Sequence, residues 1–125
     1  MVTKEEENET SYHDSLIDVN NEVLTIQKYN FPIFDKRIVK INNIKNMFMI
    51  EMNRGNGKYT FFGFCWKLYW YHLDRKRTLK THAIIIQEEN NNIKIGITPD
   101  DCQKCFKVLN NVINKNKDCE LKSLK

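Results

Sequence analysis

The sequence has no stretch that is long and apolar enough to cross a membrane. Its longest strongly apolar run extends from Tyr59 to Leu73, is interrupted by Lys67 and His72, and is shorter than the ~20 residues of a transmembrane helix. The chain also opens without the basic and then apolar leader of a secreted protein. From these absences we expect a cytoplasmic protein with reduced thiols.

Catalytic signatures are missing as well. His13, His72 and His82 come without a local nucleophile motif. The turn Gly55–Gly57 lacks the strand–loop–helix context and the following Lys-Ser or Lys-Thr of a phosphate loop. The pattern therefore predicts a protein that is not an enzyme and holds no cofactor, with a small enzyme of an unrecognised kind as an alternative.

The chain has no complete set of paired cysteines at metal-ligand spacing: of its four cysteines, only Cys102 and Cys105 stand in a C-x-x-C pair. Such a pair makes half of a zinc site, but Cys65 and Cys119 offer no second pair at ligand spacing. Both paired cysteines lie on the apolar side of a predicted helix, and free cysteine is among the most buried residue types. We expect buried thiols and no metal site.

Charge is distributed unevenly along the chain. Residues 1–22 carry seven acidic side chains against Lys4, a balance of −6, so the formal net charge of +4 leaves +10 for residues 23–125. Residues 1–21 are polar and acidic and are predicted to form a disordered tail. A basic body suits an anionic partner such as nucleic acid or a lipid surface, while the other interpretation is a solvated surface with a solubilising tail.

The clearest structural signals come from the C-terminal third. His82–Gln87 is an apolar, β-branched run and Ile93–Ile97 alternates with period two, so both predict strands, and the asparagines between them favour a turn. Thr98 and Pro99 then form a helix start, with Thr98 as the N-cap. Residues at helical spacing predict a helix over 99–114 whose apolar stripe covers a sheet. That stripe consists of Cys102, Cys105, Phe106, Leu109, Val112 and Ile113.

Strand composition recurs upstream, at 22–29, 37–41, 44–51, 58–65 and 67–72. The chain therefore predicts a mainly β domain over residues 22–115, with about six to seven antiparallel strands capped by one C-terminal helix. A flexible tail is expected at 116–125.

Aromatic residues are concentrated at 59–71. Phe62-Gly63-Phe64 is similar to the aromatic strand of RNA-recognition modules, in which exposed rings stack on bases. The flanking basic-glycine pair is absent, and Lys67 stands where an aromatic residue belongs. Core aromatics are the first interpretation, and a single-stranded nucleic-acid-binding module is the alternative.

One short segment collects five cations against a single acid, Asp74. On a loop and the adjoining strand ends, such a cluster binds phosphates, with an affinity that falls as salt rises. A plain solvated loop is the other interpretation. The predicted ligand- or membrane-binding residues are Lys67, Arg75, Lys76, Arg77 and Lys80.

Several short motifs also follow one another in a familiar order. They are Arg37-Ile38, Ile41 with Ile44, the Gly55–Gly57 turn, Phe62-Gly63, Arg75–Arg77, Ala83–Ile86, Ile97-Thr98-Pro99-Asp100-Asp101 and Phe106 with Leu109. In these residues the chain resembles the bacterial pleckstrin-homology-like (PH-like) domain family. The resemblance implies a barrel of two bent antiparallel sheets, closed at one corner by the C-terminal helix, and a binding role without a reaction. We therefore expect a non-enzymatic adaptor that docks a protein partner or an anionic membrane surface through basic loops, in the cytoplasm or peripherally at a membrane.

Overall fold

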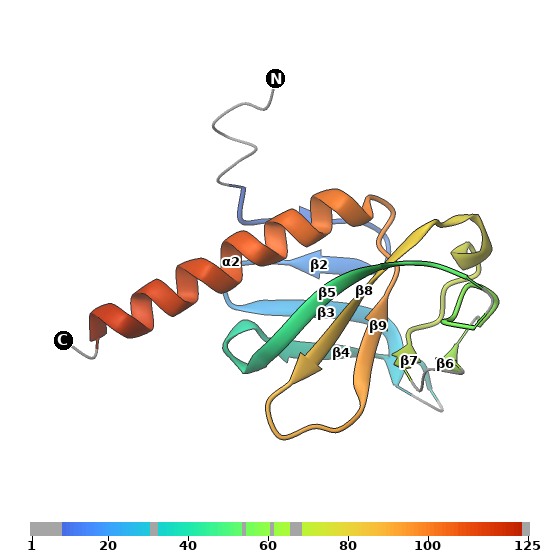
Figure 1. Cartoon of the computed structure of the whole chain (residues 1–125), viewed down its shortest axis with the longest axis horizontal. Coiled ribbons are helices and arrows are strands. Elements are labelled where there is room, and N and C mark those ends of the chain that lie inside the picture. The colour runs from blue at the N-terminus through green and yellow to red at the C-terminus, as the bar shows by residue number, and fades with distance from the viewer. Residues whose placement is uncertain (1–8, 31–32, 54, 61, 66–68, 124–125) are drawn as a thin grey trace.

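The computed structural model describes residues 9–30, 33–53, 55–60, 62–65 and 69–123, which form two β-sheets and one long C-terminal helix (Figure 1). The first sheet is a four-stranded antiparallel meander of β1 (Tyr12–His13), β2 (Ile17–Val19), β3 (Val23–Asn30) and β4 (Asp35–Lys40). In β3, Leu24 and Ile26 are buried whereas Thr25 is only half-buried, so the alternation expected of a strand turns one face of this sheet to the core.

Five strands form the second sheet, in the order β5-β8-β9-β7-β6. Their bounds are β5 (Ile44–Glu51), β6 (Gly63–Phe64), β7 (Tyr69–Tyr71), β8 (His82–Glu88) and β9 (Lys94–Ile97). β8 and β9 pair antiparallel, with Ile85 opposite Gly96, so the predicted hairpin is confirmed. Asn90 in its turn has a φ of 62°, the left-handed backbone that asparagine tolerates.

β7 and β9 pair in parallel, so the prediction that all strands are antiparallel is wrong. After β7 the chain passes through the short helix η2 (Arg77–Leu79) and β8 before it returns as β9, which gives it the long connection that a parallel pair needs. Because parallel strands end at the same edge of a sheet, His72 after β7 and Thr98 after β9 lie next to each other. The backbone amide of Thr98 donates to Nε2 of His72 at 3.1 Å.

Helix α2 (Cys102–Ser123) begins at Asp101, whose Oδ1 accepts a hydrogen bond from the backbone N–H of Lys104 at 3.1 Å. Asp101 is therefore the N-cap. The prediction of Thr98 as N-cap is wrong, because the Thr98 hydroxyl is buried and bonds to Asp74 instead. The helix also passes its predicted end at 114 and takes in most of the predicted flexible tail, since residues 115–123 include lysines, a glutamate and a leucine, which favour helix.

α2 lies along one side of the molecule (Figure 1) and packs on β1, β2, β8 and the short helix η1 (Ile41–Asn43). The fully buried part of its stripe is Cys105, Val108, Leu109 and Val112. Phe106 was expected in the core and is partly buried against it. No helix in the described part of the chain has the length and apolarity to cross a bilayer.

The main core fills the space between the two sheets and the helix. It joins Leu24, Ile26 and Val39 of the first sheet to isoleucines of β8 and β9 and to the buried stripe of α2. Within the described residues the two sheets remain separate and do not close on each other. The mainly β architecture with one C-terminal helix is confirmed, and the closed barrel is not.

The segment predicted as a disordered tail contains β1 and β2, so the folded domain begins before the predicted boundary at residue 22; residues 1–8 lie outside the described residues. Tyr12, Ile17 and Val19 are buried in the main core. Asp14 shapes the turn between β1 and β2, because its Oδ1 accepts from the backbone amides of Leu16 and Ile17, each at 2.8 Å. A few apolar side chains at alternating positions and one turn-forming aspartate are enough to add two strands to a segment whose average composition is acidic.

Candidate functional site

Arg77, one of the five predicted docking cations, is completely buried. Its guanidinium donates through Nε to Thr98 Oγ1 at 3.2 Å, through Nη2 to the carbonyl oxygen of His72 at 2.5 Å, and through Nη1 to the carbonyl oxygen of Thr60. It also lies over the ring of Tyr71, 4.6 Å from the ring centroid. The prediction of Arg77 as a surface residue is therefore wrong, because η2 turns the side chain inward, where its guanidinium donates to three oxygen acceptors.

Lys80 belongs to the same buried network. Its Nζ donates to Asp74 Oδ2 at 2.6 Å and to the carbonyl oxygen of Thr98 at 2.5 Å, and it lies 3.4 Å from Asp100 Oδ1. The Thr98 hydroxyl donates to the same Asp74 oxygen at 2.7 Å. Lys80 is partly exposed and neutralises a buried carboxylate, so much of its charge is engaged inside the protein; its role as a docking cation stays a prediction.

Tyr71 packs against the guanidinium of Arg77 at one side of this network. Its hydroxyl donates to the carbonyl oxygen of Asn56 at 2.7 Å, and its ring lies between Gly57 and Gly96. A Cβ at either glycine would overlap atoms of the ring, so both positions need glycine for this close approach.

His72 is buried in this network with an incomplete set of hydrogen bonds. Because its Nε2 accepts from the Thr98 amide, the neutral ring carries its proton on Nδ1. Nδ1 has no hydrogen-bond partner among the described residues. The ring is therefore held through Nε2 by the amide and, at 3.5 Å, the hydroxyl of Thr98, and its Nδ1–H is a buried donor without a partner among the described residues.

The network shifts the protonation of its members in different directions. Burial, together with the nearby charge of Arg77, lowers the pKa of His72 to about 3, so the ring is neutral at neutral pH. Burial also lowers the pKa of Arg77, to about 10, which leaves it charged. For Asp74, burial acts to raise the pKa, but hydrogen bonds from Lys80, Thr98 and the Lys76 amide outweigh it and hold the pKa below its ordinary value. The site is a neutral imidazole beside a paired carboxylate and two cations.

Acid should destabilise the fold through His72. The unfolded chain binds a proton on this histidine below pH ~6.5, whereas the folded chain binds it only near pH 3, so stability falls as pH decreases through that window. Each pH unit below 6.5 should cost up to about 1.4 kcal/mol of unfolding free energy. Urea melts from pH 6.5 to 4.5 measure this slope. His72→Gln keeps an acceptor for the Thr98 amide and does not titrate, so its slope should be clearly smaller; equal slopes in both proteins would contradict the assignment.

The remaining predicted cations do not form one cluster with Arg77 and Lys80. Arg75 and Lys76 are exposed on the loop between β7 and η2. Lys67 lies outside the described residues. Among the predicted cations that the structure describes, Arg75 and Lys76 are the two exposed ones, and two side chains supply less attraction to an anionic surface than five.

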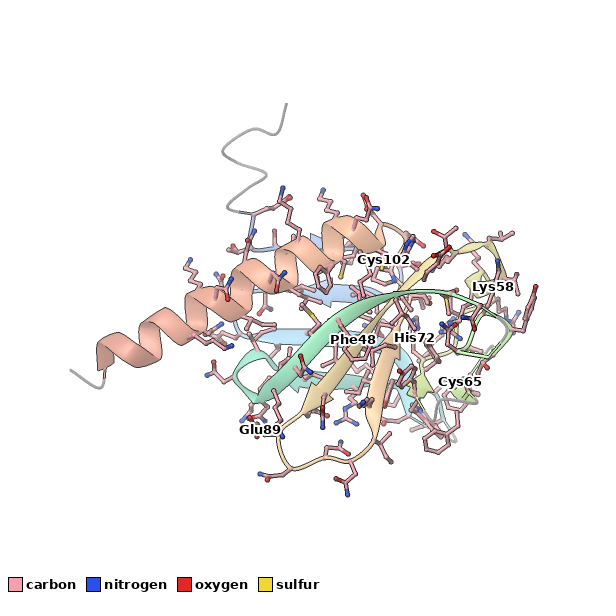
Figure 2. All side chains as sticks on the ribbon, in the orientation of Figure 1. Phe48, Lys58, Cys65, His72, Glu89 and Cys102 are labelled. Atoms are coloured by element: carbon pink, nitrogen blue, oxygen red, sulfur yellow. The ribbon has the colours of Figure 1, made fainter. Side chains whose placement is uncertain are left out.

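The predicted thiol pair lies in the first turn of α2. Burial raises the pKa of Cys102 to about 11 and that of Cys105 well above its ordinary value, so neither is a thiolate at neutral pH. Figure 2 shows Cys102 at the start of α2 and Cys65 well apart from it, on the side of β6. Across the described residues no group of three or more histidine, cysteine or acidic side chains is gathered to hold a metal ion.

The aromatic stretch 59–71 is divided between core and surface. Tyr71 is buried and Trp70 half-buried, whereas Phe64 is 48% exposed and Tyr59 is exposed as well. Phe61 and residues 66–68 lie outside the described residues. Buried and exposed aromatic side chains therefore both occur within this one stretch, and the nucleic-acid-binding alternative stays a prediction.

Phe64 and Trp70 line a pocket of about 310 Å³, which we call the aromatic pocket. It opens between the first sheet and the β6–β7 part of the second sheet, beside the turn that joins β8 to β9. Besides these two rings its walls are Tyr29, Asn30, Arg37, Asn91 and Ile93. Ile93 is 45% exposed at its rim.

Trp70 organises the rings around the aromatic pocket. Phe64 and Phe62 meet it edge-on, with centroids at 4.8 and 5.1 Å and planes inclined by 86° and 81°. Phe34, which is exposed, packs on Phe62 at 4.8 Å in the same manner, so the apolar surface continues from the pocket to the β3–β4 turn. The indole Nε1 donates to the carbonyl oxygen of Tyr29 at 3.1 Å, which fixes the orientation of the tryptophan.

The charged side chain at the pocket is already paired. Arg37 forms an ion pair with Glu88, and its guanidinium lies 5.3 Å from the centroid of the Tyr29 ring. Burial raises the pKa of Tyr29 to about 12, so this phenol is neutral. The pocket is therefore lined mainly by apolar and aromatic side chains, and the charge of Arg37 is balanced by Glu88.

Sequence reasoning did not find Tyr29, Arg37 or Ile93 as pocket residues. Each was placed on a strand or strand end, and the pocket exists only because the two sheets bring these ends to Trp70. The one sign of an apolar surface in the sequence was the apolar residues beside predicted turns, such as Ile33 and Phe34, and the structure leaves both exposed.

Comparison of the chain with protein-family models, curated proteins and solved structures finds no match.

Proposed function

We propose that this protein is a non-enzymatic binding domain that docks a protein partner through the aromatic pocket. The observation that supports the proposal most directly is the pocket itself: about 310 Å³, walled by aromatic rings and continuous with exposed Phe34 and Phe64. Contiguous exposed apolar surface of this kind is a common mark of interaction sites. Aromatic pockets that accept one large side chain are also where binding energy is concentrated in protein interfaces.

A non-enzymatic role is supported by the polar network. Its hydroxyl, carboxylate and ammonium groups, on Thr98, Asp74 and Lys80, are bonded to one another, and Thr98 and Asp74 are buried. Groups that are paired with one another in this way stabilise the fold and are already engaged, which disfavours a role for them as acid, base or nucleophile.

The geometry of the aromatic pocket favours an apolar side chain over a nucleobase. Stacking on bases needs open ring faces, and here the rings pack edge to face around Trp70. Binding of a nucleic-acid strand also needs unpaired cations along its path, whereas Arg37 is paired with Glu88. A leucine, phenylalanine or tryptophan of a partner protein meets neither obstacle.

The adaptor role expected from the PH-like resemblance is kept in this proposal, and the docking surface is changed. The aromatic pocket replaces the basic loop, because Arg77 and Lys80 are used inside the fold. The PH-like relationship and the cytoplasmic location remain predictions of the sequence.

Selection of peptides from a random displayed library tests the docking function. Phe64→Glu and Ile93→Glu place a charge at the pocket and, because both side chains are about half exposed, should leave the melting temperature close to that of the parent. Leu79→Glu is the matched control, since Leu79 is 81% exposed on η2 and does not line this pocket. We expect selected peptides to share a large apolar residue, and to bind each pocket variant at least about 10-fold more weakly than the parent and the control.

Two other outcomes would overturn the proposal. Retention on single-stranded RNA that is lost in Phe64→Glu and falls steeply with salt would indicate a nucleic-acid module. Sedimentation with phosphatidylserine vesicles that is unaffected by Phe64→Glu, together with no selected peptide, would return the function to a membrane surface.

A further inference from the structure

Another, smaller pocket shares no lining residue with the aromatic pocket and gathers cations from segments that are far apart in the sequence. Its volume is about 230 Å³, and we call it the cationic pocket. Lys28 enters from β3, Arg75 and Lys76 enter from the loop after β7, and Ser15 adds a hydroxyl from the β1–β2 turn. Lys28, Arg75 and Lys76 are exposed, and none of the three has an ion-pair partner among the described residues.

A backbone hydrogen bond joins the two segments that carry these cations. The amide of Leu73 donates to the carbonyl oxygen of Lys28 at 2.8 Å, which joins the loop to β3. Lys28 itself has a φ of 56°, within a register shift of β3 between Ile26 and Asn30. A left-handed lysine costs about 1–2 kcal/mol, so this irregular strand has an energetic penalty that the surrounding contacts overcome. On the loop side, Asp74 Oδ1 accepts from the Lys76 amide at 2.9 Å.

The charge of the cationic pocket remains positive after its acids are counted. Asp74 and Asp100 also line it, against the three cations, which gives 3 − 2 = +1. Both carboxylates face Lys80, at 2.6 and 3.4 Å, and including this ammonium makes the local balance +2. Both acids are thus paired with Lys80, and the charged side chains of the pocket that have no ion-pair partner among the described residues are the three cations.

We infer that the cationic pocket binds a phosphate monoester group of a small anionic molecule. A phosphate at neutral pH carries nearly two negative charges and three acceptor oxygens. An arginine supplies a fork of donors to such oxygens, lysines supply point charges, and a serine hydroxyl supplies one more donor. At about 230 Å³ the space is below the range of drug-sized ligand sites, so it suits a phosphate with a short organic group.

This inference does not depend on the aromatic pocket or on the proposed protein partner. The same chemistry is carried by free phosphorylated metabolites and by lipid headgroups with a terminal phosphate. The experiment below therefore has one arm for each source.

The first arm titrates glycerol 3-phosphate into ¹⁵N-labelled protein at constant ionic strength and follows backbone amide shifts. We expect saturable shifts at Ser15, Lys28, Arg75 and Lys76. Lys28→Gly removes one cation while keeping a residue that adopts the left-handed backbone without strain, so it should fold normally. Lys28→Gly and the double variant Arg75→Ala with Lys76→Ala should each weaken binding at least about 10-fold, as expected for loss of charge-assisted hydrogen bonds.

Lys36→Ala is the matched control, because Lys36 is an exposed lysine of β4 that does not line the cationic pocket. Its affinity for glycerol 3-phosphate should equal that of the parent. Linear, unsaturable shifts in the parent, or equal loss of affinity in Lys36→Ala and Lys28→Gly, would show general charge attraction and overturn the inference.

The second arm sediments the protein with vesicles that contain phosphatidic acid, whose headgroup is a phosphate monoester, and with phosphatidylcholine vesicles. Sedimentation on phosphatidic acid that is lost in Lys28→Gly supports the pocket and assigns it to a membrane lipid. Saturable binding of glycerol 3-phosphate without sedimentation supports the pocket and assigns it to a soluble metabolite.

Discussion

Replacing Arg77 by Met should lower the free energy of unfolding by about 3–5 kcal/mol, the cost of removing one partner from a buried charged network. The substitution keeps much of the side-chain volume but removes every donor. The carbonyl oxygens of buried His72 and half-buried Thr60 would lose their guanidinium contacts. The Tyr71 ring would also lose the cation that lies over it. Urea melts at neutral pH measure the effect as a lower transition midpoint at unchanged slope.

Two variants separate the possible causes. Arg77→Lys restores a charge but has one ammonium for acceptors in three directions, so it should recover only part of the lost stability. Arg75→Met is the control, because Arg75 is an exposed arginine two residues away. Its stability should stay within about 0.5 kcal/mol of the parent. If Arg77→Met is as stable as Arg75→Met, the buried network does not hold the loop as described.

The contrast between Arg75 and Arg77 shows why the cationic cluster could not be predicted from the sequence. A run of charges in the sequence shows that cations are neighbours along the chain, but it does not show in which direction each side chain points. η2 rotates Arg77 toward acceptors on residues 60, 72 and 98, which only the tertiary fold brings together. Lys28, the cation that does join Arg75 and Lys76, is separated from them by more than forty positions.

Local signals predicted the elements whose pattern and ends agree. The β8–β9 hairpin follows from β-branched runs around an asparagine turn, and α2 follows from its apolar stripe. The predicted N-cap was three residues too early. Both Thr98 and Asp101 are good N-cap residue types, and only the fold shows that the Thr98 hydroxyl donates to Asp74 while Asp101 caps the helix.

Long-range arrangement was the part that local patterns could not supply. The parallel pairing of β7 with β9 depends on how a connection of more than twenty residues returns to the sheet. The folded β1–β2 segment depends on a core surface that α2 and β3 provide from elsewhere in the chain. The aromatic pocket combines both effects, because its walls come from β3, β4, β6, β7 and the β8–β9 turn.

Leu109→Ala should destabilise the protein by about 2–5 kcal/mol, the range for truncating a fully buried leucine. Leu109 has no exposed surface and lies where the stripe of α2 enters the core between the sheets. Truncation removes apolar contacts and leaves a cavity that elements from both ends of the chain would have to fill. Because α2 packs on β1 and β2 as well as β8, the loss should also loosen the N-terminal strands. Hydrogen exchange should therefore rise at residues 12–19 more than at β5.

Leu79→Ala is the matched control for Leu109→Ala. It makes the same chemical change at a leucine that is 81% exposed, so its free energy of unfolding should change by less than about 0.5 kcal/mol. A small loss of stability in Leu109→Ala, similar to that of the control, would mean that α2 does not cover the core. Faster exchange confined to α2 would mean instead that the helix covers the core but does not hold β1 and β2 in place.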